Sequence, residues 1–441
     1  MTVALTEDQK LHARWYSGAA RLAVASGWTT QETSWHFARV NQHASDLRRL
    51  KRLVQNGRRH AAFRLQDHIL HSQSGRLCAF IDQYVLKAKS GKIRPLTVQQ
   101  LDNRLASVRP DQQIFGSALV TSRKKADGKK RVIMSPDWKI RTAQRLVSRT
   151  LPCWNVQNDF DHNAPGRGTH TAVKEVIRQI KEEGITSFVL FDIKDFFSSV
   201  RPSHLKGRLP LPDRVMKHAV FFTRRALLVL ANKLDMIEVE AARQCLPAGA
   251  RLSGMIASSL LGWILHNLSG AKGLVTFVDD GLIGACDPAG ANNLAEALKS
   301  RLSQHPGGPL YLKHLSVVDA HQGFPFLGYW IKIHSDTFVG TETVVVRPSH
   351  AAKNKMKRNL FRRLRVLGKS AGYDALVEVA HTYRVNWLSS FPLWNPSEEE
   401  LFDLEGEVET YVVDYLDGYE GKQSLPKVKL AMIGVGILKP S

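Results

Sequence analysis

Three aspartates follow apolar segments whose fold could bring their carboxylates together. Asp192 follows the run SFVLF, and Asp279 and Asp280 follow the run LVTFV. Apolar runs of this length are typical of buried strands, and acids at strand ends can lie along one edge of a sheet. Carboxylate oxygens are the ligands that Mg²⁺ prefers, and two ions about 3.5–4 Å apart can activate a hydroxyl and steady a leaving pyrophosphate. The residues therefore predict two-metal nucleotidyl transfer.

Each of these segments also has a simpler interpretation by itself. An Asp280-Gly281 pair between apolar runs is a strong signal for a tight hairpin turn. The segment Asp192–Asp195 could be an ordinary strand end that leads into a helix cap. The rest of the chain decides between these interpretations.

Other motifs stand in the order typical of one enzyme family. FDIKDFFSSV, CLPAGARLSG and FVDD resemble motifs A, B and C of reverse transcriptases, and the match is similar to the bacterial group II intron, retron and defence-associated branch. The resemblance implies that Asp192, Asp279 and Asp280 are the catalytic acids. It implies further that Asp192, Ile193, Asp279 and Asp280 hold two Mg²⁺ ions, or Mn²⁺.

The resemblance also assigns residues to the incoming nucleotide. The basic segment 124–131 resembles the fingers hairpin that grips the triphosphate, with Lys124, Lys129 and Arg131 as candidates, because basic side chains, and the planar fork of arginine in particular, bind phosphate oxygens. Its alternative is a solvated turn whose lysines prevent unwanted strand pairing. Ala248 and Gly249 lie in the motif B turn, where glycine permits close approach of the backbone.

Phe197 bears on the choice of sugar. In the family, a bulky side chain five positions after the first catalytic aspartate stands against the 2′ carbon of the nucleotide, so the resemblance implies a preference for deoxynucleotides. The alternative is that Phe196 and Phe197 are core residues, and we expect one of the pair to be in the core. The chain departs from the family at Phe277, Ala248 and Arg251, which leaves metal binding intact but places template handling and fidelity in question.

Downstream segments resemble parts that hold the product duplex and the leaving group. Residues 323–329, GFPFLGY, resemble the primer grip, although core packing would explain the aromatic residues equally well. A basic stretch with apolar residues at helical spacing follows and predicts a thumb helix that lies along nucleic acid. Its candidate nucleic-acid-binding residues are Arg347, Lys353, Lys357, Arg358 and Arg362. Lys313 or His314 is the nearest candidate for the proton donor to pyrophosphate.

The two ends of the chain differ in charge. Residues 47–95 resemble the RNA-binding N-terminal extension of group II intron enzymes and contain a predicted basic helix, Leu47–Arg59, and residues 161–168 resemble the block that contacts the template. The C-terminal segment predicts an acidic helix from Glu398, and either docking onto the basic surface or a subunit contact would explain it. Tyr411, Tyr415 and Tyr419 recur at four-residue spacing, which packing or a protein-linked priming hydroxyl would explain.

Composition agrees with an enzyme of nucleic acids. A net charge of +22 over 441 residues attracts phosphate backbones. The four cysteines show no paired spacing, which favours a reducing cytoplasm over a disulfide framework or zinc site. We expect neither a secretory signal nor a membrane span, because the longest apolar run, Met255–Ile264, is too short.

Together these features predict an α+β fold in the arrangement of a right-hand polymerase. The expected parts are a helical N-terminal extension (1–95), fingers (96–181), a palm with a small antiparallel sheet backed by helices (182–335), a basic helical thumb (336–395) and an acidic tail (396–441). The predicted function is RNA-directed DNA synthesis, with an RNA template, dNTPs and a DNA product as partners, a homo-oligomer as an open alternative to a monomer, and a dedicated noncoding RNA of antiphage defence as the expected template. The alternatives are a catalytically idle, maturase-like RNA-binding protein and an intron-derived mobility enzyme; a copier of RNA into RNA is disfavoured by Phe197.

Overall fold

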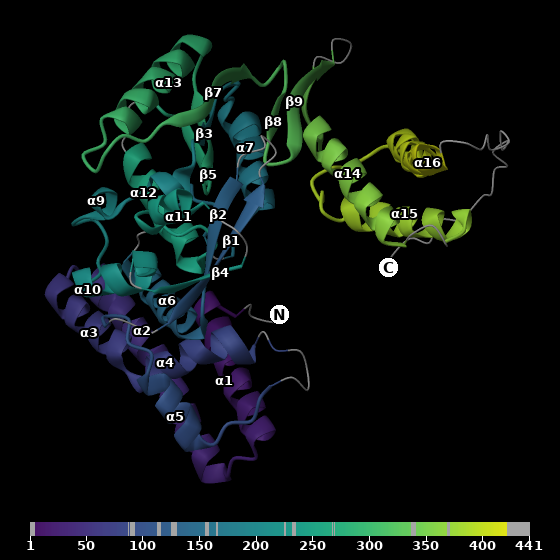
Figure 1. Cartoon of the computed structure of the whole chain (residues 1–441). Helices are drawn as coiled ribbons and strands as arrows, with labels where there is room; N and C mark the ends of the chain where they lie inside the picture. The colour runs from purple at the N-terminus through teal and green to yellow at the C-terminus, as the bar shows by residue number, and fades with distance from the viewer. Residues whose placement is uncertain are drawn as a thin grey trace. The chain divides into compact units, whose positions relative to one another are not determined.

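The computed structural model divides into two compact units, Met1–Gly323 and Phe324–Ser441 (Figure 1). It describes residues 5–86, 88, 93–112, 116–124, 130–154, 158–164, 166–224, 226–231, 235–266, 268, 270–336, 341–367 and 371–420. The division falls inside the segment expected to form the palm, and the predicted domain limits otherwise remain predictions. Each unit is described by itself below.

The first unit begins with helices. They are α1 (Glu7–Ser26), α2 (Thr30–Gln55), α3 (Arg59–His71), α4 (Gln73–Phe80), a π-helical turn (Ile81–Val85) and α5 (Val98–Ala106). Thr6, Thr29 and Thr97 cap α1, α2 and α5 through their hydroxyls. The basic helix predicted over Leu47–Arg59 was placed wrongly, because α2 ends at Gln55 and Gly57 adopts a left-handed φ of 70° that separates it from α3.

A three-stranded sheet follows, and it contains the predicted basic hairpin. Strands β1 (Ser117–Lys124) and β2 (Lys130–Pro136) pair antiparallel, and β4 (Leu227–Leu230), which the sequence did not predict, pairs parallel to β1. Helix α6 (Trp138–Thr150) follows β2 and is capped by Asp137. A 3-10 turn (Leu151–Trp154) ends this segment.

The small antiparallel sheet expected within residues 182–335 is present, with four strands in the order β5-β6-β3-β7. They are β3 (Ser187–Ile193), β5 (Gly273–Phe277), β6 (Asp280–Ala285) and β7 (Leu312–Asp319). The helices α7 (Thr169–Glu183), α12 (Arg251–Leu265) and α13 (Pro288–Ser303) lie in the same unit as this sheet (Figure 1). Residues of β3, β6, α12 and α13 share one buried apolar core, which fixes the sheet and hence the ends of its strands.

Short elements connect β3 to α12. They are α8 (Phe196–Ser199), α9 (Pro202–Leu205), α10 (Asp213–Val215), a π-helical turn (Met216–Val220), a 3-10 turn (Phe222–Arg224) and α11 (Met236–Arg243).

The second unit joins a small sheet to a helical group. Strands β8 (Phe324–Phe326), β9 (Tyr329–Asp336) and β10 (Thr341–Pro348) form the sheet, followed by α14 (His350–Leu367), α15 (Tyr373–Leu388) and α16 (Glu398–Glu420). The predicted basic and acidic helices are α14 and α16. They pack on each other and on α15 around Met356, Leu360 and Val408.

The structure explains the acidic helix by self-docking. Lys353 pairs with Glu407 at 3.3 Å, and Lys357 pairs with Asp414 at 3.0 Å. Carboxylates of α16 thus face lysines of α14 within one unit.

Within the described residues, no helix combines the length and the apolar character needed to cross a bilayer.

Candidate active site

The hairpin between β5 and β6 places the second pair of acids. Phe277 pairs with Asp280 across the two strands, so the turn consists of Val278 and Asp279. The interpretation of Asp280-Gly281 as the turn itself is therefore wrong, because both residues belong to β6. Val278 has a φ of 62°, a left-handed conformation that is a genuine outlier for a β-branched residue. Strain of this kind persists where the surrounding structure holds it, often at functional sites.

Glycine at position 281 has a packing reason. A Cβ on Gly281 would lie 2.1 Å from the ring of Phe191 on the neighbouring strand β3. The ring therefore lies directly over the backbone of β6, one residue after Asp280. This contact holds the β5–β6 hairpin in its position beside β3.

Asp192 lies beside the hairpin in the sheet. It pairs in register with Asp280, and the backbone N–H of Ile193 donates to the carbonyl oxygen of Asp279 at 3.2 Å. The register between β3 and β7 shifts at Asp192/Ile193, which marks an irregularity of the strand at the acid. The three aspartates predicted from separate segments are thus neighbours at one end of the sheet.

Electrostatics show that these acids interact. Burial, followed by the charges of Asp279 and Asp192, raises the pKa of Asp280 to about 6. Burial also raises the pKa of Asp279, and Asp192 adds to the effect while Arg131 and Lys313 oppose it. Two carboxyls at this site therefore hold their protons more strongly than free aspartate does.

Lys313 is the cation that meets the acids. Its Nζ donates to Asp192 Oδ2 at 2.5 Å, and this bond, with the neighbouring aspartates, raises the pKa of Lys313. His314 instead makes its hydrogen bond with Ser316. Of the two candidate proton donors, the structure places Lys313 at the three aspartates.

The donor set fits divalent metal ions in its chemistry. Neighbouring carboxylates repel one another, a shared cation of high charge relieves this repulsion, and oxygen donors suit Mg²⁺ and Mn²⁺. In the described part of the chain, no three Asp, Glu, His or Cys side chains are already arranged as a metal cluster. Since Lys313 holds the carboxylate of Asp192, metal binding would require Asp192 to exchange the ammonium group for the ion.

A hollow lies beside the basic hairpin. Its volume is about 480 Å³, and its lining includes Lys130, Arg131, Asp195, Arg201 and Arg224. Because the charge of Arg131 also acts on Asp279, this arginine faces both the hollow and the acids. Lys129 lies outside the described residues, and of Lys124 the structure describes the backbone, which pairs with Lys130.

The sequence did not single out Arg201 and Arg224. Arg201 directly follows motif A, and Arg224 lies in a 3-10 turn, so neither belongs to a recognisable motif. Both reach the hollow only through the chain path between β3 and α12. No sequence signal short of the fold would have found them.

The motif B turn contacts the basic hairpin. Gly249 has a φ of 94°, and a Cβ there would lie 2.6 Å from Cγ2 of Ile133 on β2. The backbone N–H of Met134 donates to the carbonyl of Ala248 at 2.9 Å. The close approach predicted for Gly249 is therefore made to strand β2. Ser253 lies in the first turn of α12 and donates to the carbonyl of Pro247 at 2.8 Å.

Phe196 and Phe197 differ in burial. Phe196 is 1% exposed, which confirms that one of the pair is a core residue, whereas Phe197 is half-buried against the same core. The half-buried ring of Phe197 follows Asp192 by five residues, so its role toward the sugar stays a prediction.

The segment that resembles a template-contacting block is attached to the edge strand β5. The backbone N–H of His162 donates to the carbonyl of Thr276 at 2.8 Å, and Thr276 donates in return to Phe160 at 2.8 Å. Asp161 is fully buried, accepts from the N–H of Asn163 at 2.9 Å and has a raised pKa because of burial. Helix α7 then begins at Thr169, directly after this block.

The remaining candidates belong to the second unit. Arg347, Arg358 and Arg362 are exposed, whereas Lys353 and Lys357 are engaged by α16. The aromatic residues of GFPFLGY are packed, since Phe324, Phe326 and Tyr329 are all buried. Tyr411 and Tyr415 pack against Phe361, and the side chain of Tyr419 lies outside the described part. Packing thus explains the first two tyrosines.

Comparison with known proteins yields one family. Residues 123–331 match the family described as reverse transcriptase (RNA-dependent DNA polymerase), and no curated protein matches the chain. The solved structures include telomerase from Candida albicans in complex with a TWJ fragment of telomeric RNA, at 12% identity and a TM-score of 0.34, covering 70% of this chain and 60% of that one. Apo telomerase from Candida tropicalis is 12% identical with a TM-score of 0.35, covering 68% and 61%.

At TM-scores this low, the telomerase structures add no argument about function, and this chain spans about 60% of the length of the first of them. The family match covers the basic hairpin, all three aspartates and Lys313. Residues 123–331 therefore match a reverse transcriptase domain, and the family they match is described as RNA-dependent DNA polymerase.

Proposed function

We propose that this enzyme copies RNA into DNA by two-metal nucleotidyl transfer, with Asp192, Asp279 and Asp280 as the metal-binding acids. The observation that carries the proposal is the register of the sheet, which pairs Asp192 with Asp280 beside Asp279. Burial, followed by the charges of Asp279 and Asp192, raises the pKa of Asp280. An uncompensated group of like charges is costly unless cations bind to it. When bound, Mg²⁺ ions would supply charge for the attacking hydroxyl and the leaving pyrophosphate; the carbonyl of Ile193 is a further ligand in this proposal.

The chain's own residues then have distinct roles. Arg131, with Lys124 and Lys129 of the same hairpin, binds the triphosphate of the nucleotide, because cationic groups hold phosphate oxygens, arginine in two places. Ala248 and Gly249 form the floor beneath the nascent pair, and Phe197 excludes a 2′ hydroxyl. Lys313, whose ammonium group would leave Asp192 if a metal ion were bound there, donates the proton that pyrophosphate requires.

The proposed template is a structured noncoding RNA, and the proposed setting is antiphage defence in a bacterial cytoplasm. The net charge of +22 supports RNA binding in general. The exposed Arg347, Arg358 and Arg362 of the second unit are the proposed contacts to the nucleic-acid backbone. The defence setting is supported by the motifs that resemble the bacterial branch of the family.

The decisive experiment combines RNA identification with synthesis. The protein is purified from its native host, the bound nucleic acid is sequenced, and labelled dNTPs or rNTPs are supplied with Mg²⁺. An Asp279→Asn and Asp280→Asn double variant is the test, and Glu296→Gln, an exposed acid of α13, is the matched control.

We expect DNA synthesis by the wild type and the control, none by the double variant, and one enriched RNA in all three. Synthesis that persists in the double variant would refute the assigned acids. Bound RNA without synthesis in any of the proteins would leave an RNA-binding scaffold as the function.

A further inference from the structure

The hollow beside the basic hairpin carries more positive than negative charge. Its volume of about 480 Å³ is typical of a site for a small molecule. Four cationic side chains and two acids line it, namely Lys130, Arg131, Arg201, Arg224, Asp195 and Glu238. This excess of positive charge favours an anionic ligand.

Arg201 and Arg224 are held in place by neutral acceptors. The guanidinium group of Arg201 donates to the thiol of Cys245, and burial raises the pKa of this thiol, which therefore stays neutral. Nη2 of Arg224 donates to the backbone carbonyl of Gln244 at 3.3 Å. Within the described residues, neither arginine forms an ion pair with an acid, and both are exposed. Their charges are thus positioned but not compensated, and a ligand can reach them.

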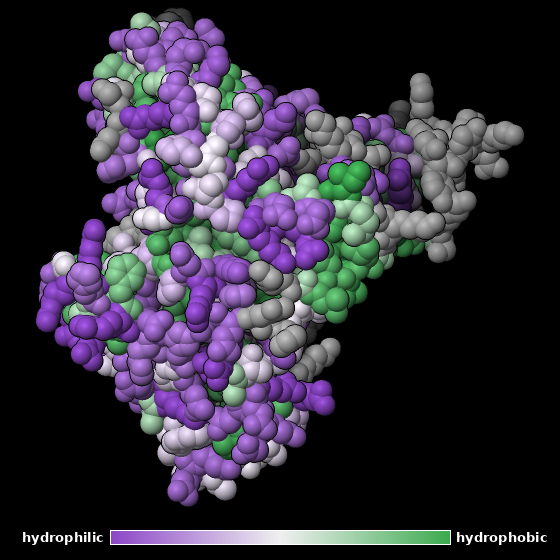
Figure 2. Space-filling view, turned by 60° about the vertical axis from the view of Figure 1, so that its left-hand side comes forward, coloured by the Kyte–Doolittle hydropathy of each residue, from purple (hydrophilic) through white to green (hydrophobic). Residues whose placement is uncertain are grey.

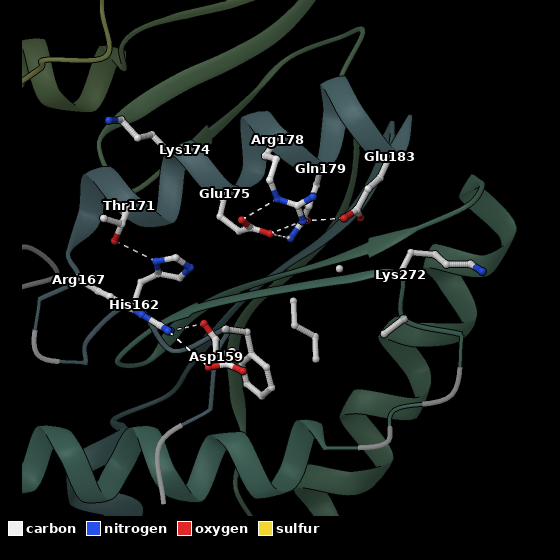
Figure 3. Close-up of a pocket in the computed structure, with 14 residues that line it drawn as sticks. Asp159, His162, Arg167, Thr171, Lys174, Glu175, Arg178, Gln179, Glu183 and Lys272 are labelled. Atoms are coloured by element: carbon white, nitrogen blue, oxygen red, sulfur yellow. Dashed lines mark hydrogen bonds and ion pairs between the residues drawn. The ribbon is translucent and has the colours of Figure 1, made fainter. Parts of the chain in front are cut away.

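A larger hollow of the same unit differs in this respect. Its volume is about 770 Å³, and it lies against α7 and the start of β5 (Figure 3). There the guanidinium group of Arg178 binds Glu175 at 2.7 Å and Glu183 at 2.6 Å. The charge of Arg178 is therefore compensated within the protein, unlike the charges of Arg201 and Arg224.

The hollow beside the hairpin adjoins the three aspartates. Asp195 lines it and stands three residues after Asp192, at the start of α8, where the chain leaves β3 through a left-handed φ of 49°. Arg131 also lines the hollow, and its charge acts on Asp279. A ligand with a chain of phosphates would therefore have room for one phosphate at the aspartates and for others in the hollow.

We propose that Arg201 and Arg224, together with Arg131, bind the terminal phosphates of the incoming nucleoside triphosphate. This inference rests on the proposed function, in which the aspartates act at the α-phosphate. Each guanidinium group can bind phosphate oxygens through two parallel N–H donors. The same groups hold the pyrophosphate that the transfer releases. Arg201 and Arg224 are thus substrate-binding residues of the connection between β3 and α12.

Calorimetry of the full chain in EDTA measures the binding of inorganic pyrophosphate and tripolyphosphate without a contribution from metal ions. The test variants are Arg201→Gln, Arg224→Gln and the two combined. The matched control is Arg208→Gln with Arg214→Gln, because both are exposed arginines of the same connection and neither belongs to the lining. Arg201→Lys with Arg224→Lys keeps the charges but not the paired donors.

We expect each glutamine variant to weaken pyrophosphate binding about tenfold, and the combined variant about a hundredfold, because hydrogen bonds to a charged ligand are lost. The lysine variant should retain part of the affinity, and the control should bind as the wild type does. Binding that the combined glutamine variant leaves unchanged, or no binding of either phosphate by the wild type, would overturn the proposal.

Kinetics with Mg²⁺ extend the test to the nucleotide. In the combined glutamine variant, KM for a dNTP should rise by a similar factor while kcat changes less, since ground-state binding is lost. Pyrophosphate should also inhibit this variant less than the wild type. Weaker RNA binding with an unchanged KM for the dNTP would show that the hollow holds an RNA backbone, and would overturn the proposal.

The outcome is separable from that of the polymerase. The Asp279→Asn and Asp280→Asn double variant keeps the hollow, so it should bind pyrophosphate in EDTA at least as tightly as the wild type. Synthesis that requires the aspartates, with pyrophosphate binding that ignores Arg201 and Arg224, would refute the role of the arginines alone. Pyrophosphate binding that depends on the arginines, without synthesis by the wild type, would refute the proposed polymerase alone.

Discussion

At the scale of single residues, Lys313 and the proposed metal ions would bind the same carboxylate, that of Asp192. Asp192 Oδ2 accepts from Lys313 at 2.5 Å, while Asp279 and Asp280 are left with raised pKa values. The ammonium group of Lys313 supplies positive charge at Asp192, where a metal ion would supply it in the proposed reaction. Lys313 is thus a counter-ion in the metal-free protein and a proton donor in the proposed reaction.

Replacing Lys313 should separate these two roles. In Lys313→Gln, we expect the rate of incorporation to fall by about 10²–10⁴ because the general acid is lost. The Mg²⁺ concentration for half-maximal activity should fall as well, because no ammonium competes for Asp192. Single-turnover kinetics over a Mg²⁺ series measure both quantities. Lys313→Arg, which keeps the charge, should keep the Mg²⁺ requirement; an unchanged requirement in the glutamine variant would contradict the competition.

Asp280 should make the stability of the metal-free protein depend on pH. Its folded pKa of about 6 lies above the value of about 3.9 for an unfolded aspartate, so the folded state binds the proton more tightly. This contribution is fully present below about pH 4 and is lost as the pH rises through about 6. Asp280→Asn should therefore be more stable than the wild type at pH 8 and equal at pH 4.

Urea unfolding in EDTA at several pH values measures this difference. Because the side chain of Asp280 is partly exposed, solvent screens the repulsion and we expect ~1 kcal/mol or less at pH 8. A difference that is the same at every pH would mean that the carboxyl does not titrate as inferred. Adding Mg²⁺ should reverse the order, since only the wild type gains stability from the ion.

At the scale of elements, the active hairpin is held by packing between strands. The ring of Phe191 on β3 covers the backbone of Gly281 on β6, and the strained Val278 precedes Asp279. A hairpin built from a more favourable turn sequence would not require this support. The position of the acids thus depends on a contact that involves no catalytic residue.

Gly281→Ala should show the cost of disturbing that contact. The new methyl group would lie 2.1 Å from the Phe191 ring, so we expect the free energy of unfolding to fall by about 1–3 kcal/mol. Chemical denaturation measures the change, and Phe191→Leu in the same chain should restore part of it. Gly168→Ala is the control, because a Cβ there meets nothing within 4 Å and its φ of −177° is extended. Equal effects of the two alanines would contradict the packing argument.

The pairing of α14 with α16 should control how well the second unit binds RNA. Glu407→Gln with Asp414→Asn would release Lys353 and Lys357 for phosphate. We expect tighter RNA binding, and a plot of log affinity against log salt that is steeper by about one to two units. Fluorescence anisotropy at several salt concentrations measures the slope. The control is Glu398→Gln with Glu399→Gln, which are exposed; an unchanged slope in the test variant would remove both lysines from the nucleic-acid surface.

At the scale of the whole molecule, positive charge dominates, although acids are gathered in a few places. The chain carries 62 lysines and arginines against 40 acids, and α16 holds an unusual share of the acids in one element. Polar residues cover much of the face shown in Figure 2, between smaller apolar areas. A basic protein of this kind binds phosphate backbones without regard to sequence.

RNA binding by the whole enzyme should therefore be strongly salt-dependent. With six to ten phosphates neutralised, affinity should fall by about 10³–10⁵ between 50 and 200 mM salt. Filter binding over a salt series measures this fall. A nearly flat dependence would mean that base contacts or shape, and not the net charge, carry the affinity.

The amino-acid sequence was enough to predict which residues could do chemistry and which strands and helices carry them. Asp192, Asp279 and Asp280 were found because apolar strands that end in acids leave a local pattern. Helix α14 was found because apolar residues recur at helical spacing, and α16 because acids are concentrated from Glu398 onward. The strand order that joins the acids could be expected only through the resemblance to a family. Local regularities of this kind are readable because they depend on neighbouring residues alone.

The contacts of those residues became known only from the folded chain. The hairpin turn consists of Val278 and Asp279 and not of Asp280 and Gly281. Gly249 lies against β2, and Lys313 pairs with Asp192. Arg201 and Arg224 line one hollow with Arg131. These contacts join residues of separate elements, which packing and burial bring together. A local pattern of charge or hydropathy does not specify which of many chemically suitable residues will be in contact.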